Sequence, residues 1–347
     1  MHAPTPAPLD RSLVERWWRD EESRNHALDA LRLGAAERDL RGISFANEDL
    51  SGLDLTGYDL TGADLRAANL SGAILLGAKL VGAVLRGANL DRAELVGADL
   101  RGADLGGCSA VRTSFGHANV SKANLFRANA PGATFTEARL CDADLRAAHF
   151  EEAAFRDADL RGADLSSAIL DGADMECARV AGATFDRVTV VGTRLNRMVG
   201  YEKASWLEIE INRANLSGAH LLRRFVLDQN YLQEFKSRGR WAAAIHWVWW
   251  ITSDCGRSIV RWATWTLIIT TAYALAYTVV DIDYGRHVTD LSPLYFSIVT
   301  ITTLGYGDVL PASLGAQVVV MSQVIIGYLM LGGLLSLFAG MMGRRAE

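Results

Sequence analysis

The chain has 347 residues, enough for two or three domains, and its net charge of −5 is distributed unevenly. Residues 1–221 carry about −7 and residues 222–261 about +4, so the sequence divides into regions of different character. The four cysteines, Cys108, Cys141, Cys177 and Cys255, show no CxxC spacing and no obvious pair, which fits a reducing compartment rather than a disulfide framework.

The N-terminal segment has prolines at positions 4, 6 and 8 followed by charged residues, so it lacks the apolar core of a cleaved signal peptide. Residues 10–34 predict one amphipathic helix ending near Gly34, with Leu13, Trp17 and Leu28 or Leu31 available for an apolar face. We expect residues 1–38 to form a helical cap over the first coil of the domain that follows.

From Leu40 onwards a large apolar residue recurs at every fifth position, as in Leu50, Leu55 and Leu60, and the phase continues to Leu195. A small residue, usually alanine, stands two positions before it. This period matches neither a helix nor a plain strand, and it predicts three extended residues followed by a corner, where glycine is frequent. Coils of this kind bury their apolar rows on one another and build a solenoid.

The repeat resembles that of the pentapeptide-repeat family, whose motif is Ala-Asp/Asn-Leu-x-x. The resemblance implies a right-handed quadrilateral β-helix over residues 39–221, with four repeats in each coil. Residues 40–195 hold about 32 repeats, or about eight coils. The phase then slips by one residue, which predicts a bulge near Gly200 before the ladder resumes at Trp206, Ile211, Leu216 and Leu221.

The outward Asp and Asn residues of the repeat, such as Asp49, Asp54 and Asp59, predict an elongated acidic surface. Some soluble members of the family resemble a DNA duplex in shape and charge, but a solvated polar face is the simpler interpretation. The repeats contain no Ser/His/Asp set, no metal-ligand spacing and no phosphate-binding loop. We therefore expect no enzymatic activity, no cofactor and no nucleic-acid partner.

Residues 222–257 form a linker with two helical signals. Its first part fits a short amphipathic helix and is followed by a basic cluster, Lys236, Arg238 and Arg240. The apolar run from Trp241 to Ile251 is too short to span a membrane, and its tryptophans predict a helix at the membrane surface. Burial of this run against the solenoid is the alternative.

The C-terminal region contains two apolar segments of membrane length. Residues 262–280 carry no formal charge and would span about 28 Å as a helix. Residues 317–342 form the second segment, whose only strongly polar side chains are Gln317 and Gln323. Between them Ser292 and Pro293 predict the start of a short helix over residues 294–301, with Ser292 as its N-cap.

The motif Thr302-Thr303-Leu304-Gly305-Tyr306-Gly307-Asp308 follows this short helix directly. It resembles the selectivity filter of potassium channels, and the resemblance extends over about residues 256–347. The resemblance implies K⁺ coordination by Thr303, Leu304, Gly305 and Tyr306, with filter support from Gly307, Asp308, Tyr295 and Thr300. Leu304 stands where most members have valine or isoleucine, and Val299 where many have glutamate. A glycine-rich loop between two buried helices of a soluble protein is the alternative.

The second apolar segment carries Gly327 where the inner helix of this family has its hinge glycine. Counting by four, Leu331, Leu335 and Ala339 share one helical face and would line the pore. Two alternatives stay open: Gly327 could serve close helix packing, and Gly332 and Gly333 could also form the hinge.

The sequence thus predicts a multidomain membrane protein with a helical cap (1–38), a pentapeptide-repeat β-helix (39–221), a linker (222–257) and an all-α two-span pore domain (258–347). The expected function is passive K⁺ permeation through a homotetramer in contact with membrane lipid, with the solenoid regulating the pore or docking an unknown cytoplasmic partner. The charge distribution predicts a multi-pass protein of the plasma (inner) membrane with both termini cytoplasmic. The alternative is a membrane-anchored interaction scaffold whose pore is non-conducting or poorly selective.

Overall fold

The structure is a computed structural model that describes residues 28, 29, 31, 38–255, 258–285, 288–302, 304, 305, 307 and 309–346, with side chains described as far as Ala339. The chain divides into two compact units, residues 1–233 and 234–347, which are described separately. Most of the helix expected over residues 10–34 lies outside the described residues. Leu28 and Leu31, which are described, are both buried in the core of the first unit.

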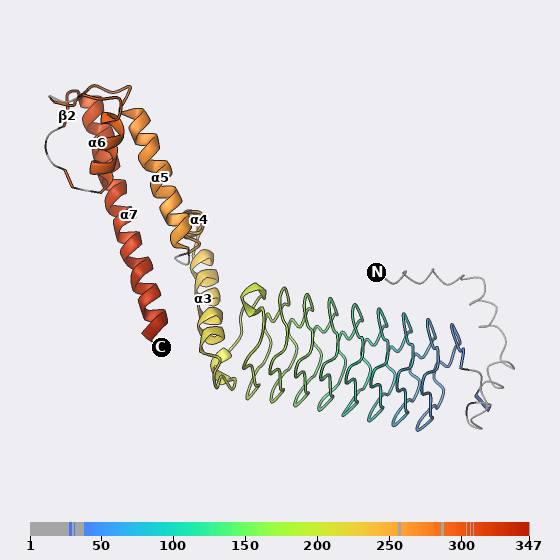
Figure 1. The fold of residues 1–347 in the computed structure, drawn as a ribbon. Helices are drawn as coiled ribbons and strands as arrows, with labels where there is room; N and C mark the ends of the chain where they lie inside the picture. The colour runs from blue at the N-terminus through green and yellow to red at the C-terminus, as the bar shows by residue number, and fades with distance from the viewer. Residues whose placement is uncertain are drawn as a thin grey trace. The chain divides into compact units, whose positions relative to one another are not determined.

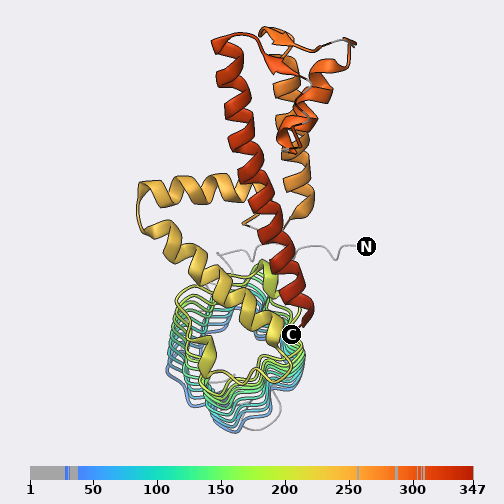
Figure 2. The same ribbon diagram turned by 90° about the vertical axis from the view of Figure 1, so that its left-hand side faces the viewer.

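The first unit is a stack of coils, seen side by side in Figure 1 and as a four-sided outline in Figure 2. Parallel bridges join residues one coil apart, so that Asp49 pairs with Asn69 and Asn69 with Asn89. The ladder is continuous, because Leu50 N donates to Asn69 O at 2.7 Å while Asn69 N donates to Glu48 O at 2.9 Å. The solenoid predicted from the five-residue period, and the quadrilateral β-helix that the family resemblance implies, are therefore confirmed.

Each corner of the coil is a turn whose third residue is left-handed. Leu53 N donates to Leu50 O at 3.3 Å across the first such turn, and Gly52 between them has φ +64°. Glycine adopts this conformation without a Cβ clash, which explains its frequency at the corners. Arg92 (φ +62°) and Asp142 (φ +57°) occupy the same position, at a cost of about 1 kcal/mol each.

The interior of the coils is filled by the large apolar row and the alanine row. Phe115 stacks on Phe135 with ring centroids 4.7 Å apart, and Phe135 stacks on Phe155 at 4.9 Å. Ala110 and Ala130 lie in the neighbouring inward row and are fully buried. Their small volume leaves interior space for the phenyl rings, so these apparent weak points of the repeat are compensated by packing.

The predicted phase slip is present after residue 199. The short 3₁₀ helix η1 (Tyr201–Lys203) absorbs the extra residue, and the next bridge joins Thr184 to Ser205. Trp206 then restores the ladder, fully buried and stacked on Phe185 at 4.2 Å. Gly200 is required here, because a Cβ on it would lie 2.8 Å from the Cβ of Ala181.

The prediction that Leu221 continues the inward ladder is wrong, since its side chain is 68% exposed. After a second 3₁₀ helix, η2 (Ile211–Arg213), the chain enters helix α3 (His220–Ser237). The helical turn directs the next residues differently from a strand, and Leu222 and Val226 are buried in place of Leu221.

Helix α3 closes the end of the coil stack with two amide side chains. Gln229 Oε1 accepts from Trp206 N at 2.7 Å, and its Nε2 donates to Ala204 O at 3.3 Å. Asn230 Oδ1 accepts from Glu208 N and its Nδ2 donates to Trp206 O, both at 2.8 Å. These two side chains take the place of the peptide groups that a further coil would supply, so this part of the strand edge is covered.

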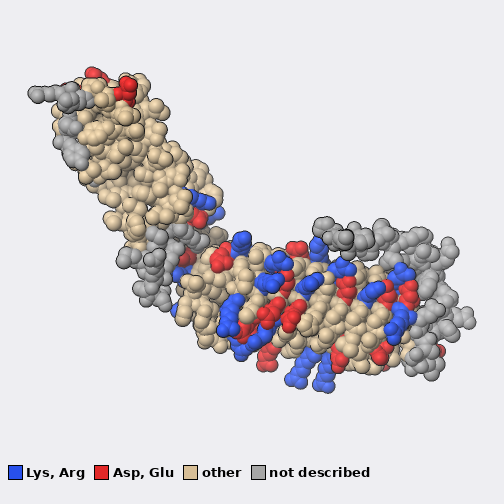
Figure 3. Space-filling model, in the orientation of Figure 1, with Lys and Arg blue, Asp and Glu red and all other residues tan. Residues whose placement is uncertain are grey.

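The expected elongated acidic surface is not formed, and Figure 3 shows blue and red side chains intermixed over the visible coils. Successive outward residues lie on different sides of the four-sided coil, so Asp49, Asp54 and Asp59 do not form one column. Many of the aspartates also pair with an arginine two residues later, as Asp64 does with Arg66 at 2.7 Å. The surface is therefore of mixed charge.

The second unit contains, in chain order, α4 (Arg240–Ser253), α5 (Ile259–Ala276), β1 (Ile282–Asp283), α6 (Ser292–Ile301), β2 (Leu310–Pro311) and α7 (Leu314–Ala346). Figure 1 shows α5 and α7 as the two long helices of this unit, with α6 close to α7. By length and composition, α5 and the α7 segment Leu314–Ala339 could each cross a membrane. The strands β1 and β2 pair antiparallel, with Ile282 opposite Pro311.

The helix bounds differ from those of the apolar runs. Helix α5 begins at Ile259 and ends at Ala276, although the apolar run continues to Val280. It ends there because the following amides bond back by three residues: Thr278 N donates to Leu275 O and Val279 N to Ala276 O. Helix α7 extends beyond the apolar run at both ends, to Leu314 and Ala346.

Candidate functional site

The short helix α6 leads directly into the glycine-containing motif. Its first residue is Ser292, and Leu291 is the N-cap, so the prediction of Ser292 as N-cap is wrong by one position. The helix begins earlier because Tyr295 N donates to Leu291 O at 2.9 Å, while Ser292 Oγ accepts from Thr289 N outside the helix. Pro293 is tolerated in the first turn, where no intrahelical donor is needed.

After α6 the backbone turns by means of two left-handed glycines. Leu304 N donates to Val299 O at 3.1 Å, which anchors the start of the motif to α6. Gly305 has φ +45° and Gly307 has φ +76°, conformations that strain any residue with a Cβ. This geometry explains why glycine stands at both positions.

Several residues of the predicted filter lie outside the described residues, namely Thr303, Tyr306 and Asp308. Of the four predicted supports, Gly307, Tyr295 and Thr300 are described, and the last two lie in α6. Thr300 is buried, and its side chain interacts with the hydroxyl of Tyr277 from α5. Tyr295 is 43% exposed in the protomer.

The predicted hinge residue Gly327 packs closely against α6. A Cβ added to it would lie 2.7 Å from the carbonyl oxygen of Ile301, the last residue of α6. Helix α7 runs without interruption through this position. In this conformation, Gly327 therefore allows α7 and α6 to pack closely against each other.

The predicted pore-lining residues of α7 are all exposed within the protomer. Leu331 is 43% and Leu335 is 62% exposed, and Ala339 is exposed as well. Leu337, by contrast, is buried against the protomer's own helices. The three residues are thus available to face a central pore or other subunits.

Sequence reasoning missed a buried polar network that joins α5, α6 and α7. Gln323 of α7 donates through Nε2 to Ser297 O at 3.0 Å and to Ser297 Oγ at 2.7 Å. Ser297 Oγ donates in turn to Thr270 O of α5 at 2.7 Å, and the Tyr277 hydroxyl donates to Gln323 Oε1. Gln323 itself could have indicated the network, because a polar side chain within an apolar segment requires hydrogen-bond partners.

Helix α4 presents an apolar, tryptophan-rich surface. Its large exposed side chains are Trp241, Ile245, Trp247, Val248, Trp249 and Trp250. The helix is attached to the next one, since the Trp265 indole N–H of α5 donates to Ile251 O at 3.1 Å. An exposed apolar patch with four tryptophans is typical of an interaction site or a membrane interface.

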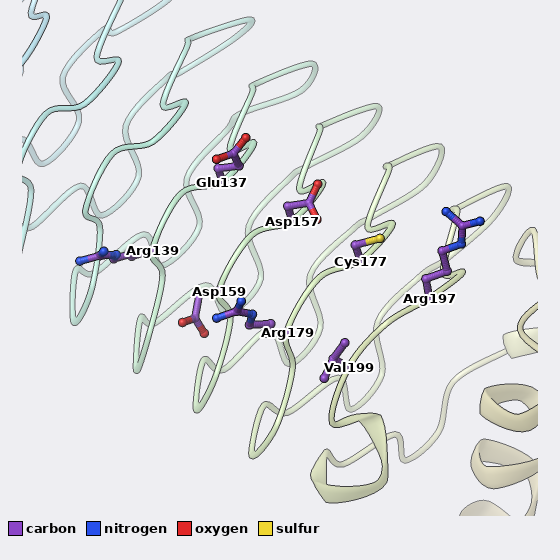
Figure 4. A pocket seen from close by; sticks show the side chains of 8 residues that line it. All are labelled: Glu137, Arg139, Asp157, Asp159, Cys177, Arg179, Arg197 and Val199. Carbon is purple, nitrogen blue, oxygen red and sulfur yellow. The ribbon is translucent and has the colours of Figure 1, made fainter.

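The solenoid carries a groove along one corner and the adjoining face, shown in Figure 4. It is lined at the corner by Glu137, Asp157, Cys177 and Arg197 and on the face by Arg139, Asp159, Arg179 and Val199. The lining holds three acidic and three basic side chains, so it favours neither an anion nor a cation.

Within the described part of the chain, no group of three or more His, Cys, Asp or Glu side chains could hold a metal ion. Two of the cysteines, Cys108 and Cys141, are the opposite of activated. Burial raises the pKa of Cys108 to about 12, and burial likewise raises the pKa of Cys141. A thiol with a raised pKa is a poor nucleophile at neutral pH.

Two family profiles match the chain. The profile described as pentapeptide repeats matches in eight copies within residues 39–77, 77–107, 108–146, 138–176 and 148–189. The profile described as ion channel matches residues 248–344. The chain is therefore a fusion of two classes of domain. Its N-terminal part is a pentapeptide-repeat β-helix, and its C-terminal part is an ion channel domain of the two-span type.

Solved pentapeptide-repeat proteins resemble this chain. HetL, involved in heterocyst differentiation regulation in the cyanobacterium Nostoc sp. strain PCC 7120, is 29% identical, and the alignment covers 52% of this chain and 94% of HetL with a TM-score of 0.31. QnrB1, a plasmid-mediated fluoroquinolone resistance protein, is 18% identical, with coverage of 52% and 95% and a TM-score of 0.37. A thylakoid lumen protein of Arabidopsis thaliana is 36% identical, with coverage of 32% and 68% and a TM-score of 0.16. No curated protein matches the chain.

Proposed function

We propose that this protein is a potassium-selective channel that conducts K⁺ passively as a homotetramer. The observation that carries the proposal is the pair of left-handed glycines, Gly305 and Gly307, directly after a short helix and between two helices of membrane length. Backbone carbonyls turned towards one side can replace the hydration shell of K⁺. Thr303, Leu304, Gly305 and Tyr306 would supply them, with K⁺ as the permeant ion and no cofactor.

Four-fold assembly follows from the same premise. One chain supplies one filter strand, and a K⁺ site of this type takes four, so we expect cyclic symmetry in the membrane. The exposed Leu331, Leu335 and Ala339 of α7 would then line the lower pore. Gly307, Asp308, Tyr295 and Thr300 would support the filter from behind.

The proposed location is the plasma (inner) membrane, with both termini on the cytoplasmic side. The loop regions between α5 and α7 carry exposed acidic side chains, including Asp281, Asp283 and Asp290, whereas Lys and Arg gather before α5 and after the apolar part of α7. Basic residues favour the cytoplasmic side of a span. The solenoid would then lie in the cytoplasm, where it could regulate the pore or dock a partner.

Reversal potentials under K⁺/Na⁺ bi-ionic conditions test the proposal on purified protein in planar bilayers. We expect a reversal potential far from zero, with the sign that results when K⁺ permeates more readily than Na⁺. We also expect loss of conduction in Gly305→Ala, because alanine at φ +45° is strained. Gly315→Ala is the matched control, since Gly315 lies in α7 and a Cβ there would meet only Ser313 Oγ, at an ordinary contact distance of 4.0 Å.

A reversal potential near zero would contradict K⁺ selectivity. Absence of any conductance from correctly assembled protein would instead favour the membrane-anchored interaction scaffold. Mass measurement of the assembly in detergent checks the stoichiometry separately, and a stable dimer or trimer would contradict the tetramer.

A further inference from the structure

The buried amide of Gln323 lies at the centre of the polar bonds that join helices α5, α6 and α7, and Tyr273 of α5 adds a second bond to α7 through Ser322 Oγ at 2.8 Å. Gln323 and Ser297 are both fully buried. The Gln323 amide uses both its donor and its acceptor, since Nε2 donates twice to Ser297 and Oε1 accepts from Tyr277. Ser297 Oγ accepts from Gln323 and donates to Thr270 O, so the network is closed.

Such a network is costly to maintain in apolar surroundings. An amide removed from water must find every partner within the protein, and an apolar side chain of the same size would pack here without that requirement. Fully satisfied buried polar groups fix one arrangement of the elements that they join. The network therefore specifies how α6 is placed between the two long helices.

The same face of α7 also holds the end of α6 by direct contact. Gln323 and Gly327 are one helical turn apart, as are Ser297 and Ile301. Gln323 bonds to Ser297, and Gly327 lies against the Ile301 carbonyl. The segment after α6 is held to this helix by the hydrogen bond from Leu304 N to Val299 O of α6.

We propose that Gln323 is a positioning residue for the filter. It holds α6 against α7 through Ser297, so that the position of α7 is carried to the α6 backbone and from there to Leu304 and Gly305. This inference rests on the proposed function for its consequence in ion selection, but the positioning itself is a property of the protomer.

The test variant is Gln323→Met, which keeps the length of the side chain and removes its hydrogen bonds. The matched control is Gln317→Met, because Gln317 lies in the same helix and is exposed. Hydrogen exchange of full-length protein in nanodiscs, followed in peptides covering residues 297–305, is the first readout. Loss of the two hydrogen bonds that Gln323 donates to Ser297 predicts exchange about tenfold faster in Gln323→Met than in Gln317→Met.

The permeability ratio of K⁺ to Na⁺ is the second readout. We expect it to fall in Gln323→Met and to stay at the wild-type value in Gln317→Met. Wild-type exchange in residues 297–305 together with a wild-type permeability ratio would overturn the proposal.

A double variant separates positioning from a general loss of stability. Gln323→Met removes the amide oxygen that accepts from the Tyr277 hydroxyl and leaves that hydroxyl only its interaction with Thr300, and Tyr277→Phe removes the hydroxyl itself. A merely stabilising role predicts that Gln323→Met/Tyr277→Phe recovers both the thermal midpoint and the permeability ratio. A positioning role predicts recovery of the midpoint alone, because Ser297 still lacks its partner on α7.

The exchange measurement keeps this inference distinct from the proposed function. If wild-type protein fails to select K⁺, the proposed function is wrong, yet faster exchange in Gln323→Met would still support the positioning of α6. If wild-type protein selects K⁺ and the variant matches it in both readouts, the inference alone fails.

Discussion

Gly327 of α7 lies against the Ile301 carbonyl of α6, and a single methyl group there would be 2.7 Å from that oxygen. The three nearest atoms all belong to the Ile301 backbone, which cannot rotate away as a side chain could. We therefore predict that Gly327→Ala destabilises the channel domain by about 1–3 kcal/mol, measured as thermal unfolding in detergent.

The control for this prediction is Gly332→Ala. Gly332 lies in the same helix with no atom near its Cβ position in the protomer. Alanine is a better helix former than glycine, so this control should be neutral or slightly stabilising, by up to about 1 kcal/mol. A Gly327→Ala protein as stable as Gly332→Ala would favour a hinge role for Gly327 over close packing.

Sequence reasoning at the residue scale succeeded where the requirement was local. The left-handed backbone at Gly305 and Gly307 could be predicted, because glycine adopts this conformation without a Cβ clash. The bond between Gln323 and Ser297 could not, because it joins residues 26 positions apart and depends on how three helices are rotated about their axes. The sequence indicated that Gln323 needed a partner, but not which one.

At the scale of elements, the five-residue period predicted the coil, its extended sides and its corners. The errors fell where a helix begins. Leu221 keeps the apolar phase, yet it is exposed because α3 starts at His220 and helical geometry replaces strand geometry. The start of α6 was placed one residue late for a similar reason, since a hydrogen bond to Leu291 extends the helix backwards.

The contact between α3 and the last coil gives a prediction of its own. Gln229 and Asn230 together make four hydrogen bonds to the backbone of residues 204–208. Replacing both with leucine should leave those peptide groups unpaired and lower local stability by about 2–4 kcal/mol, seen as faster hydrogen exchange in residues 204–208.

The matched control is Gln233→Leu, since Gln233 is an exposed glutamine of the same helix. It should leave exchange at residues 204–208 unchanged. Equal exchange in the control and in Gln229→Leu/Asn230→Leu would mean that apolar packing of Leu222 and Val226 alone closes the stack.

At the scale of the whole molecule, the chain order constrains how the two units can influence each other. All the elements that build the candidate pore lie within residues 258–346, whereas the solenoid precedes them and is joined through α3 and α4. A mechanical signal that travels along the chain from the solenoid therefore enters the channel domain at the start of α5.

This connection predicts that removing residues 1–221 changes how often the channel opens while leaving its ion selectivity unchanged. Selectivity should persist because the filter segment, its bond to α6 and the contact between α6 and α7 lie wholly within the retained part. Replacing Trp247, Trp249 and Trp250 with alanine should change opening in the same direction, because these exposed rings of α4 would no longer anchor the connecting helix at the membrane surface. Single-channel recordings in one lipid composition measure both the frequency of opening and the ion selectivity.

Gln229→Leu/Asn230→Leu provides the intermediate case, in which the solenoid is retained but its attachment to α3 is loosened. Equal opening in all four proteins would show that the solenoid acts as an anchor or docking platform and does not transmit force to the pore.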